Sequence, residues 1–260
     1  MSWFAFVNGR RRDYRSSIVS WNTFALVGFA AVIAVKGLIF FADGRYLEAL
    51  RGGAWRDNRF FETITYLGLS DWILIGSGAA LLALSLVAAN RLDRALHTVW
   101  QRLVLSFYFV FTAVALPGLI VSAVKFAIGR ARPKEVVGAF PWEWHPFAGG
   151  YDFASFPSGH ATTAGAFCVA LAFLFPRYRY PLLVAGLLVA ASRCVLGVHF
   201  PSDVLAGFSS GAGFAWIWAR AFARKRLLFT FSDGGRLALR GEGRGHLHRW
   251  PELFGLISRS

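Results

Sequence analysis

Two histidines of this sequence have neighbours that suit them to acid, base or nucleophilic chemistry. His199 and Asp203 are four residues apart, across a turn expected at Pro201. A carboxylate that binds one imidazole nitrogen fixes the tautomer and leaves the other nitrogen reactive. His160 follows Pro157-Ser158-Gly159 at the start of an apolar run. One oriented imidazole is therefore a candidate nucleophile, and the second is a candidate general acid.

The segment before His160 is a candidate anion site. Ser158 is of a type that favours the N-cap of a helix. The first turn of a helix has free N–H groups, and the helix dipole attracts negative charge there. Gly159 would let a ligand approach the backbone closely. Taken alone, the segment is better explained as a plain helix start that carries an interfacial histidine.

Three basic side chains lie within or at the ends of apolar runs. Lys125 and Arg132 are seven residues apart, so a helix that continued through both would place them about 20° apart on one face. Arg193 lies inside an apolar run, and a buried guanidinium needs an anionic partner. Three cations suit a doubly charged phosphate. As an alternative, Lys125 and Arg132 could be an ordinary basic flank of a helix. His199 and Asp203 could likewise be a structural bridge between two helix ends. Neither alternative explains Arg193.

The composition restricts where this chemistry takes place. Of the 260 residues, 56% are hydrophobic and 16% are charged, and the mean hydropathy is +0.48. A soluble globular domain has about 25% charged residues. We therefore exclude a soluble enzyme, a disordered protein and a coiled coil. The net charge of +14 leaves either a membrane protein with basic loops or a protein that binds nucleic acid.

Apolar runs of nearly the length that crosses a bilayer, about 20 residues, recur through the chain. They predict an all-α fold, an integral-membrane bundle of six transmembrane helices in residues 1–223, followed by a basic tail in residues 224–260. The first run follows a cluster of arginines and is too long for a signal peptide, so we expect an uncleaved anchor. The predicted spans are Ile18–Phe41, Trp72–Ala89, Leu103–Ile128, His160–Phe175, Leu182–Val198 and Val204–Ala223.

Basic residues fall on alternate sides of these spans. Residues 1–17, residues 90–102, the pair Arg177 and Arg179, and residues 219–260 carry net charges of +3, +2, +2 and +6, which is 13 of the total of +14. The positive-inside rule then predicts that both termini are cytoplasmic. Because the charge is divided among loops and does not form one patch, nucleic-acid binding is not expected. The same topology places every candidate site residue at the outer face.

The patterns Lys-x6-Arg-Pro, Pro-Ser-Gly-His and Ser-Arg-x5-His-x3-Asp between Lys125 and Asp203 resemble the motifs of the type-2 phosphatidic acid phosphatase family, which shares its site with the vanadium haloperoxidases. The resemblance implies that His199 is a nucleophile that becomes a phosphohistidine, that Asp203 orients it, and that His160 is the acid and base. It also implies a phosphate clamp made of Lys125, Arg132, Ser158, Gly159 and Arg193, without a metal or cofactor.

The sequence therefore predicts a lipid phosphatase of a bacterial inner membrane with its site facing the periplasm. Lipid A, undecaprenyl diphosphate, phosphatidylglycerol phosphate and phosphatidic acid are all possible substrates, and nothing in the pattern indicates an oligomeric state. An intramembrane serine protease that uses Ser158, and a transporter of anions or phospholipids, are the alternatives. The aromatic segment Lys134–Phe156 is either a rim for lipid entry or a loop on the bilayer surface.

Overall fold

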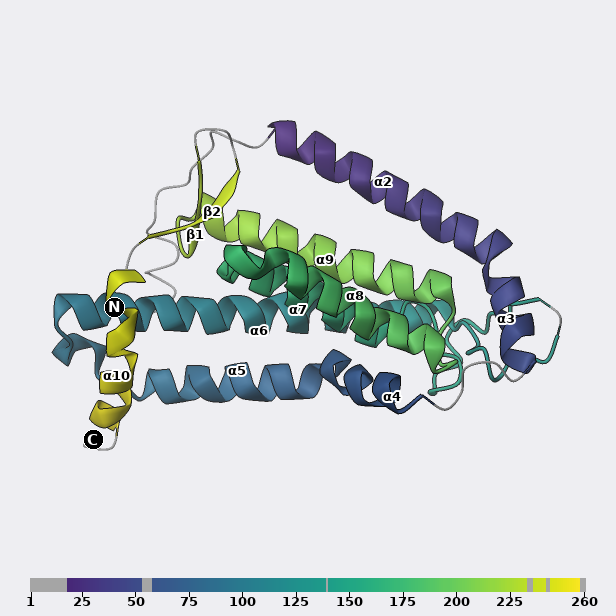
Figure 1. Ribbon diagram of the computed structural model, residues 1–260, viewed down its shortest axis with the longest axis horizontal. Coiled ribbons are helices and arrows are strands. Elements are labelled where there is room, and N and C mark those ends of the chain that lie inside the picture. The colour runs from purple at the N-terminus through teal and green to yellow at the C-terminus, as the bar shows by residue number, and fades with distance from the viewer. Residues whose placement is uncertain (1–17, 53–57, 139, 233–235, 242–243, 258–260) are drawn as a thin grey trace. The chain divides into compact units, whose positions relative to one another are not determined.

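A computed structural model of the protein describes residues 18–52, 58–138, 140–232, 236–241 and 244–257. The arginines that precede the first predicted span (Arg10, Arg11, Arg12 and Arg15) lie outside the described residues. Helices dominate the described chain (Figure 1). The elements, with η for a 3₁₀ helix, are α2 (Ile18–Phe41), α3 (Asp43–Arg51), α4 (Arg59–Thr65), η1 (Tyr66–Gly68), α5 (Ser70–Ser85), η2 (Ala89–Arg91), α6 (Arg94–Ile128), α7 (Gly159–Leu174), η3 (Pro176–Tyr178), α8 (Arg179–Val195), α9 (Pro201–Arg224), β1 (Phe229–Phe231), β2 (Leu237–Leu239), η4 (Arg244–Arg249) and α10 (Trp250–Ile257).

Each of the six predicted spans overlaps one of these helices, namely α2, α5, α6, α7, α8 and α9. Among the described residues, two helices are long and apolar enough to cross a bilayer, Trp21–Phe41 of α2 and all of α6. A third candidate results if α4, η1 and α5 are counted as one broken span. Six crossings and two cytoplasmic termini therefore stay predictions.

Two parts of the chain differ from the sequence-based expectation. The predicted loop after the first span contains α3 and α4. The all-α prediction is wrong for a short segment of the tail, where β1 and β2 form an antiparallel hairpin that pairs Phe229 with Leu239. Both strands are three residues long, so the hairpin adds a minor element to a helical fold.

The chain divides into two compact units. We call Val19–Ser70 with Ala113–Trp216 the site unit, because it contains every candidate site residue. We call Asp71–Thr112 with Ile217–Ser260, together with Met1–Ile18, the tail unit. The domain boundary predicted between residues 223 and 224 stays a prediction.

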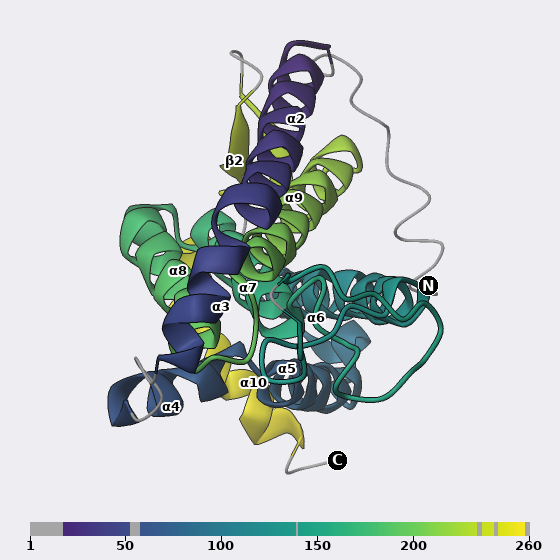
Figure 2. The same cartoon turned by 90° about the vertical axis from the view of Figure 1, so that its right-hand side faces the viewer.

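In the site unit, small residues allow α7 to pack tightly between its neighbours. A side chain at Gly165 of α7 would overlap the backbone of Phe208 in α9, and one at Gly186 of α8 would overlap the Cys168 side chain of α7. Contacts of this kind are typical of helices that pack within membranes. They bring the start of α7, the end of α8 and the start of α9 together. Figure 2 shows the site unit from the side on which α3 and α4 lie.

In the tail unit, the C-terminal segment folds back onto the turn between α5 and α6. Leu253 of α10 is fully buried in a cluster with Leu84, Val87, Leu96 and Val99. The carboxylate of Asp93 caps α6 by accepting a hydrogen bond from the Leu96 amide at 2.7 Å. The apolar cluster, more than the many basic residues of the tail, accounts for the ordered position of α10.

Candidate active site

The loop that ends α8 sets the position of His199. After α8 the chain turns at Gly197, whose φ of +66° favours a residue without a side chain. The amides of Val198 and His199 then both donate to the carbonyl of Arg193, at 3.1 and 3.3 Å. The imidazole is 2% exposed. A backbone turn therefore fixes a histidine between the end of α8 and the start of α9.

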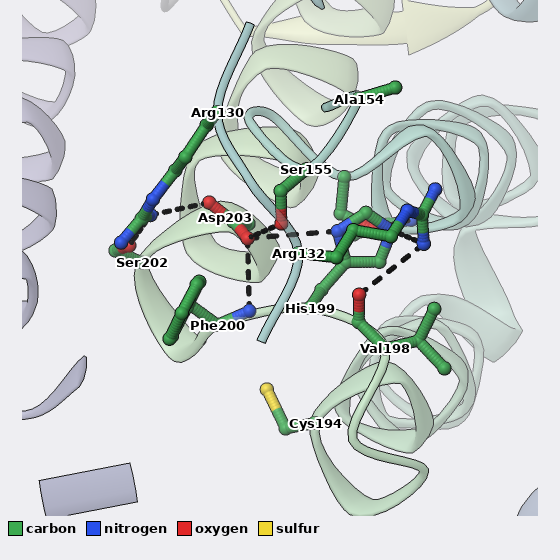
Figure 3. Close-up of polar contacts among 12 residues, drawn as sticks. Arg130, Arg132, Ala154, Ser155, Cys194, Val198, His199, Phe200, Ser202 and Asp203 are labelled. Atoms are coloured by element: carbon green, nitrogen blue, oxygen red, sulfur yellow. Dashed lines mark hydrogen bonds and ion pairs between the residues drawn. The ribbon is translucent and has the colours of Figure 1, made fainter. Parts of the chain in front are cut away.

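Asp203 lies in the first turn of α9 and faces the His199 ring (Figure 3). Its Oδ2 atom accepts a hydrogen bond from the amide of Phe200, just before the helix, at 2.9 Å. This is the geometry of a capping box, in which an acid in the first turn satisfies the amide at the cap. The distance from Asp203 Oδ2 to His199 Nδ1 is 3.7 Å. The pair is aligned but not hydrogen-bonded, as is common for catalytic pairs before substrate binds.

Two further side chains hold the Asp203 carboxylate. Ser155 Oγ donates to Oδ2 at 2.6 Å, and Arg130 Nη1 donates to Oδ1 at 2.6 Å. Arg130 is fully buried, with its guanidinium 4.3 Å from the centre of the Phe200 ring. Its Nη2 atom donates to Asp43 Oδ2 at 2.8 Å. Donors from Arg130, Ser155 and the Phe200 amide therefore hold the Asp203 carboxylate in one orientation, with Oδ2 toward His199 Nδ1.

Burial determines the protonation state of this pair. Removal from water, together with the charges of Arg132 and Lys125, lowers the pKa of the His199 imidazole to about 3, against the opposing effect of Asp203. Burial alone would raise the pKa of Asp203, but the interactions with His199, Arg130 and Ser155 lower it overall. At neutral pH the site therefore contains a neutral imidazole beside an ionised carboxylate.

The predicted helical relation of Lys125 and Arg132 is wrong. Helix α6 ends at Ile128, and Gly129 adopts a φ of +62°, with no room for a side chain beside the His145 carbonyl. Arg130 then pairs with Trp144 in an isolated antiparallel bridge, and the amides of Ala131 and Arg132 donate to the carbonyls of Glu143 and Asp152. In an extended segment, residues two apart share a face. That spacing, and not a helical repeat, brings Arg130 and Arg132 to the same site.

Arg132 lies on the opposite side of the imidazole from Asp203 (Figure 3). Its Nη1 atom is 3.5 Å from His199 Nε2 and donates to the Val198 carbonyl at 3.3 Å. The guanidinium stacks 3.7 Å from the centre of the Tyr151 ring, and Nε donates to the Tyr151 carbonyl at 2.8 Å. The Nε2 atom of His199 consequently faces a fixed cation, whereas Nδ1 faces a fixed anion.

The other two predicted cations lie near the same point. Lys125 Nζ donates to the Ala154 carbonyl at 2.6 Å, and the charges of Arg132 and Arg193 both act on it. Arg193 Nη1 donates to Thr65 Oγ1 of α4 at 2.7 Å. The Nε atom of Arg193 is buried and has no hydrogen-bond partner in the part of the chain that the structure describes. Cations with an open donor suit an anion, and the phosphate clamp of Lys125, Arg132 and Arg193 stays a prediction.

The predicted helix start is also observed. Ser158 is fully buried at the N-cap of α7, and its Oγ accepts from the Ala161 amide at 3.5 Å. Gly159 leaves space that the Lys125 side chain borders. His160 is half-buried, packs beside Gly68, and feels the charges of all three cations. The hydroxyl of Ser158 is bonded to a backbone amide and to no imidazole among the described contacts, which disfavours the serine-protease alternative.

Three residues that were not predicted contact candidate residues, namely Arg130, Ser155 and Thr65, and Asp43 contacts Arg130. Arg130 lies inside the Lys125–Pro133 pattern, and its position at the outer end of a span, against the positive-inside rule, was a usable signal. Asp43 directly follows an apolar span, where an acid requires a partner. Ser155 and Thr65 have no comparable signal in the sequence.

Within the described residues, no group of three histidine, cysteine or acidic side chains is placed to hold a metal ion. The predicted phosphate clamp includes three cationic side chains, whereas metal sites are built from carboxylates, imidazoles and thiolates. The expectation of a reaction without metal stays a prediction.

Comparisons with known proteins found a matching family and several similar phosphatases. Residues 106–227 match the family described as the PAP2 superfamily. A lipid A 1-phosphatase of Rhizobium johnstonii is 40% identical over 182 residues, which covers 69% of this chain and 74% of the relative. A lipid A 1-phosphatase of Rhizobium etli is 39% identical and covers 69% and 78%. The crystal structure of a transmembrane PAP2 type phosphatidylglycerolphosphate phosphatase from Bacillus subtilis is similar with a TM-score of 0.47, at 20% identity, over 76% of this chain and 94% of that one.

The matched region contains all three sequence patterns, and with them the two residues that face the His199 ring, Asp203 and Arg132. Phosphatases among the relatives, and apolar helices of membrane-spanning length, make the protein an integral-membrane hydrolase of phosphoric esters. The resemblance read from the sequence is thereby confirmed, and the chain belongs to the PAP2 superfamily.

Proposed function

We propose that this protein removes a phosphate group from a membrane lipid at the outer face of a bacterial inner membrane, through a phosphohistidine formed on His199. The observation that carries the proposal is the orientation of this ring, which has Asp203 at Nδ1 and Arg132 at Nε2. A neutral imidazole in this position has its reactive nitrogen directed at the place where the cations would hold a phosphate.

In the first step, the lone pair of His199 Nε2 attacks phosphorus and the bond from phosphorus to the lipid oxygen breaks. His160 donates a proton to the departing oxygen, and Nδ1–H of His199 turns toward Asp203 as the ring gains positive charge. The phosphoryl oxygens are held by Lys125, Arg132 and Arg193, with the Ser158 hydroxyl and the Gly159 amide as further donors. Positioning and charge stabilisation supply most of the rate, as phosphoryl transfer requires.

In the second step, water attacks phosphorus and the bond to Nε2 breaks. His160, now without its proton, accepts one from the water, so that inorganic phosphate leaves and both histidines return to their first state. This requires His160 to be near the phosphate, which is supported by the charges of Arg193, Lys125 and Arg132 that act on its ring.

Among possible substrates, the 1-phosphate of lipid A is favoured because both Rhizobium relatives are lipid A 1-phosphatases. The six predicted spans and the positive-inside rule support a site that faces the periplasm.

Aromatic contacts of the loop after α6 support the approach of a lipid substrate from the bilayer. In this loop, Trp142 stacks with Phe140 and lies 5.6 Å from Phe40 at the end of α2. Phe147 lies 5.6 Å from Phe126 near the end of α6. Exposed rings at the ends of two apolar helices suit the headgroup region, through which a lipid substrate approaches.

The test is phosphate release by the purified full-length protein from vesicles that contain lipid A, undecaprenyl diphosphate, phosphatidylglycerol phosphate or phosphatidic acid. We expect release from lipid A, with EDTA present, and competitive inhibition by vanadate. His199→Ala should abolish turnover, and Ser158→Ala should only weaken it. Activity on none of the four lipids would overturn the proposal, preference for another lipid would revise the substrate, and loss of activity in EDTA would contradict the metal-free mechanism.

A further inference from the structure

Three residues behind the His199–Asp203 pair form a network that the motif pattern does not include. Arg130 donates from Nη1 to Asp203 and to Ser202 Oγ, at 2.6 and 2.7 Å. From Nη2 it donates to Asp43 Oδ2 at 2.8 Å and to the Pro141 carbonyl at 3.1 Å. Ser202 closes the ring, because its Oγ donates to Asp43 Oδ2 at 2.5 Å and its amide to Oδ1 at 3.2 Å. The four side chains are fully buried.

We infer that Asp43 and Arg130 are positioning residues that act on His199 through Asp203, an inference that rests on the proposed function. Arg130 is planar and its donors are fixed relative to one another. Because one end of the guanidinium is held by Asp43, the other end holds Asp203 Oδ1 in one orientation. The second oxygen, Oδ2, is then presented to His199 Nδ1.

Charge balance gives Asp43 a second role. Arg130 and Asp203 alone would form a neutral pair, and a neutralised carboxylate is a weak partner for an imidazole that becomes positive. Burial raises the pKa of Asp43, and its hydrogen bonds with Ser202 and Arg130 oppose that shift by holding the ionised form. In that form the second carboxylate gives the buried set a net charge of −1. Asp203 therefore keeps its ability to stabilise the positive ring when Nε2 bonds to phosphorus. Burial strengthens this effect, because charges interact more strongly away from water.

Asp43 also connects the site to the membrane. It is the second residue after α2, whose segment Trp21–Phe41 is a candidate span, and it opens α3. Asp43 is separated from His199 by 156 positions in the sequence, yet two ion pairs, through Arg130 and Asp203, connect them. The position of the first helix thus sets the orientation of the catalytic carboxylate.

The test compares Asp43→Asn with Glu48→Gln in the full-length protein, on the lipid that the wild type hydrolyses fastest. Glu48 is an exposed acid of the same helix, so the control makes the same chemical change away from the network. We expect Asp43→Asn to lower kcat by about 10- to 100-fold, the usual effect of removing a group that orients a histidine from behind. KM should change by less than about threefold, because the phosphate clamp is intact, and Glu48→Gln should match the wild type.

A kcat for Asp43→Asn within twofold of the wild type would overturn the inference, as would an equal loss in both variants. If Asp43→Asn shows no cooperative melting, Ser202→Ala replaces it, since it removes one bridging hydroxyl and leaves the charges. Ser202→Ala should lower kcat at least threefold with KM retained, and unchanged kcat overturns the inference. Turnover by wild type and Glu48→Gln tests the proposed function separately. If both are inactive on every lipid, the proposed function fails and the inference fails with it.

Discussion

Two arginines of this protein each join two carboxylates, and their surroundings differ completely. In the site unit, Arg130 bonds Asp43 and Asp203, and all three side chains are 0% exposed. In the tail unit, Arg249 bonds Asp93 at 2.9 Å and Glu252 at 2.7 Å, and the three side chains are 27%, 54% and 49% exposed. The local chemistry is the same, but water reaches only the second set.

The difference shows what each set does. Exposed ion pairs are screened by water and salt and contribute little to stability. A buried set must recover the large free energy of removing three charges from water, and apolar residues of similar volume often stabilise a fold as well. Stability alone therefore does not explain the burial of Arg130. Its contacts with the carboxylate beside His199 give the functional reason.

Removing the buried arginine should have the largest effect. Arg130→Gln leaves two carboxylates buried without their cation, which destabilises a fold by about 3–5 kcal/mol. We expect a large fall in melting temperature and loss of phosphate release to below about 1% of the wild type. Thermal unfolding and turnover of the purified variant measure both. Near-normal turnover in a folded Arg130→Gln variant would contradict the role of the buried set.

A fall in pH from 7 to 5 should have only a small effect on kcat/KM. The neutral form of His199 is the nucleophile, and burial lowers the pKa of this imidazole to about 3. As the pH falls from 7 to 5, the ring therefore stays neutral, and kcat/KM should lose no more than about threefold through His199. An ordinary exposed imidazole, with a pKa of about 6.5, would lose more than tenfold. The measurement is a kcat/KM profile in which substrate ionisation is recorded separately, and a fall of more than tenfold between pH 7 and pH 5 would contradict a buried, neutral His199.

Removing the exposed arginine should have the smallest effect. Arg249→Gln should leave turnover and melting temperature unchanged, because both of its ion pairs are open to solvent. Leu253→Ala is the positive control, since this side chain is fully buried among apolar residues of α5 and α6 and its truncation destabilises by about 2–5 kcal/mol. Limited proteolysis of the tail compares the two. Faster cleavage of the tail in Arg249→Gln, or in moderate salt, would show that the ion pairs of Arg249 keep the tail in place, and would contradict this prediction.

The sequence was sufficient to predict the parts of the site that follow from local rules. Ser158 was expected as an N-cap, and it is one. His199 and Asp203 were expected to face each other across the turn before α9, and they lie 3.7 Å apart at Nδ1 and Oδ2. Six apolar runs located six helices. Each of these inferences depends on residues that are close in the sequence or on hydrophobicity alone.

The parts that were not predicted depend on long-range contacts. A helical repeat was assumed for Lys125 and Arg132, but Gly129 ends the helix and a two-residue spacing takes over. Asp43 meets Arg130 across 87 positions of sequence, and no periodicity encodes such a pair. The hairpin of the tail pairs residues around 230 and 238, in a stretch that was predicted only as a basic tail.

The most direct test of the account is to trap the phosphorylated enzyme. The protein is mixed briefly with a lipid substrate labelled in the transferred phosphate, quenched in alkali and digested for mass spectrometry. The account predicts an acid-labile, alkali-stable phosphoryl group on His199 that is absent from His199→Ala. A phosphoryl group on Ser158, or hydrolysis without any labelled enzyme, would contradict it.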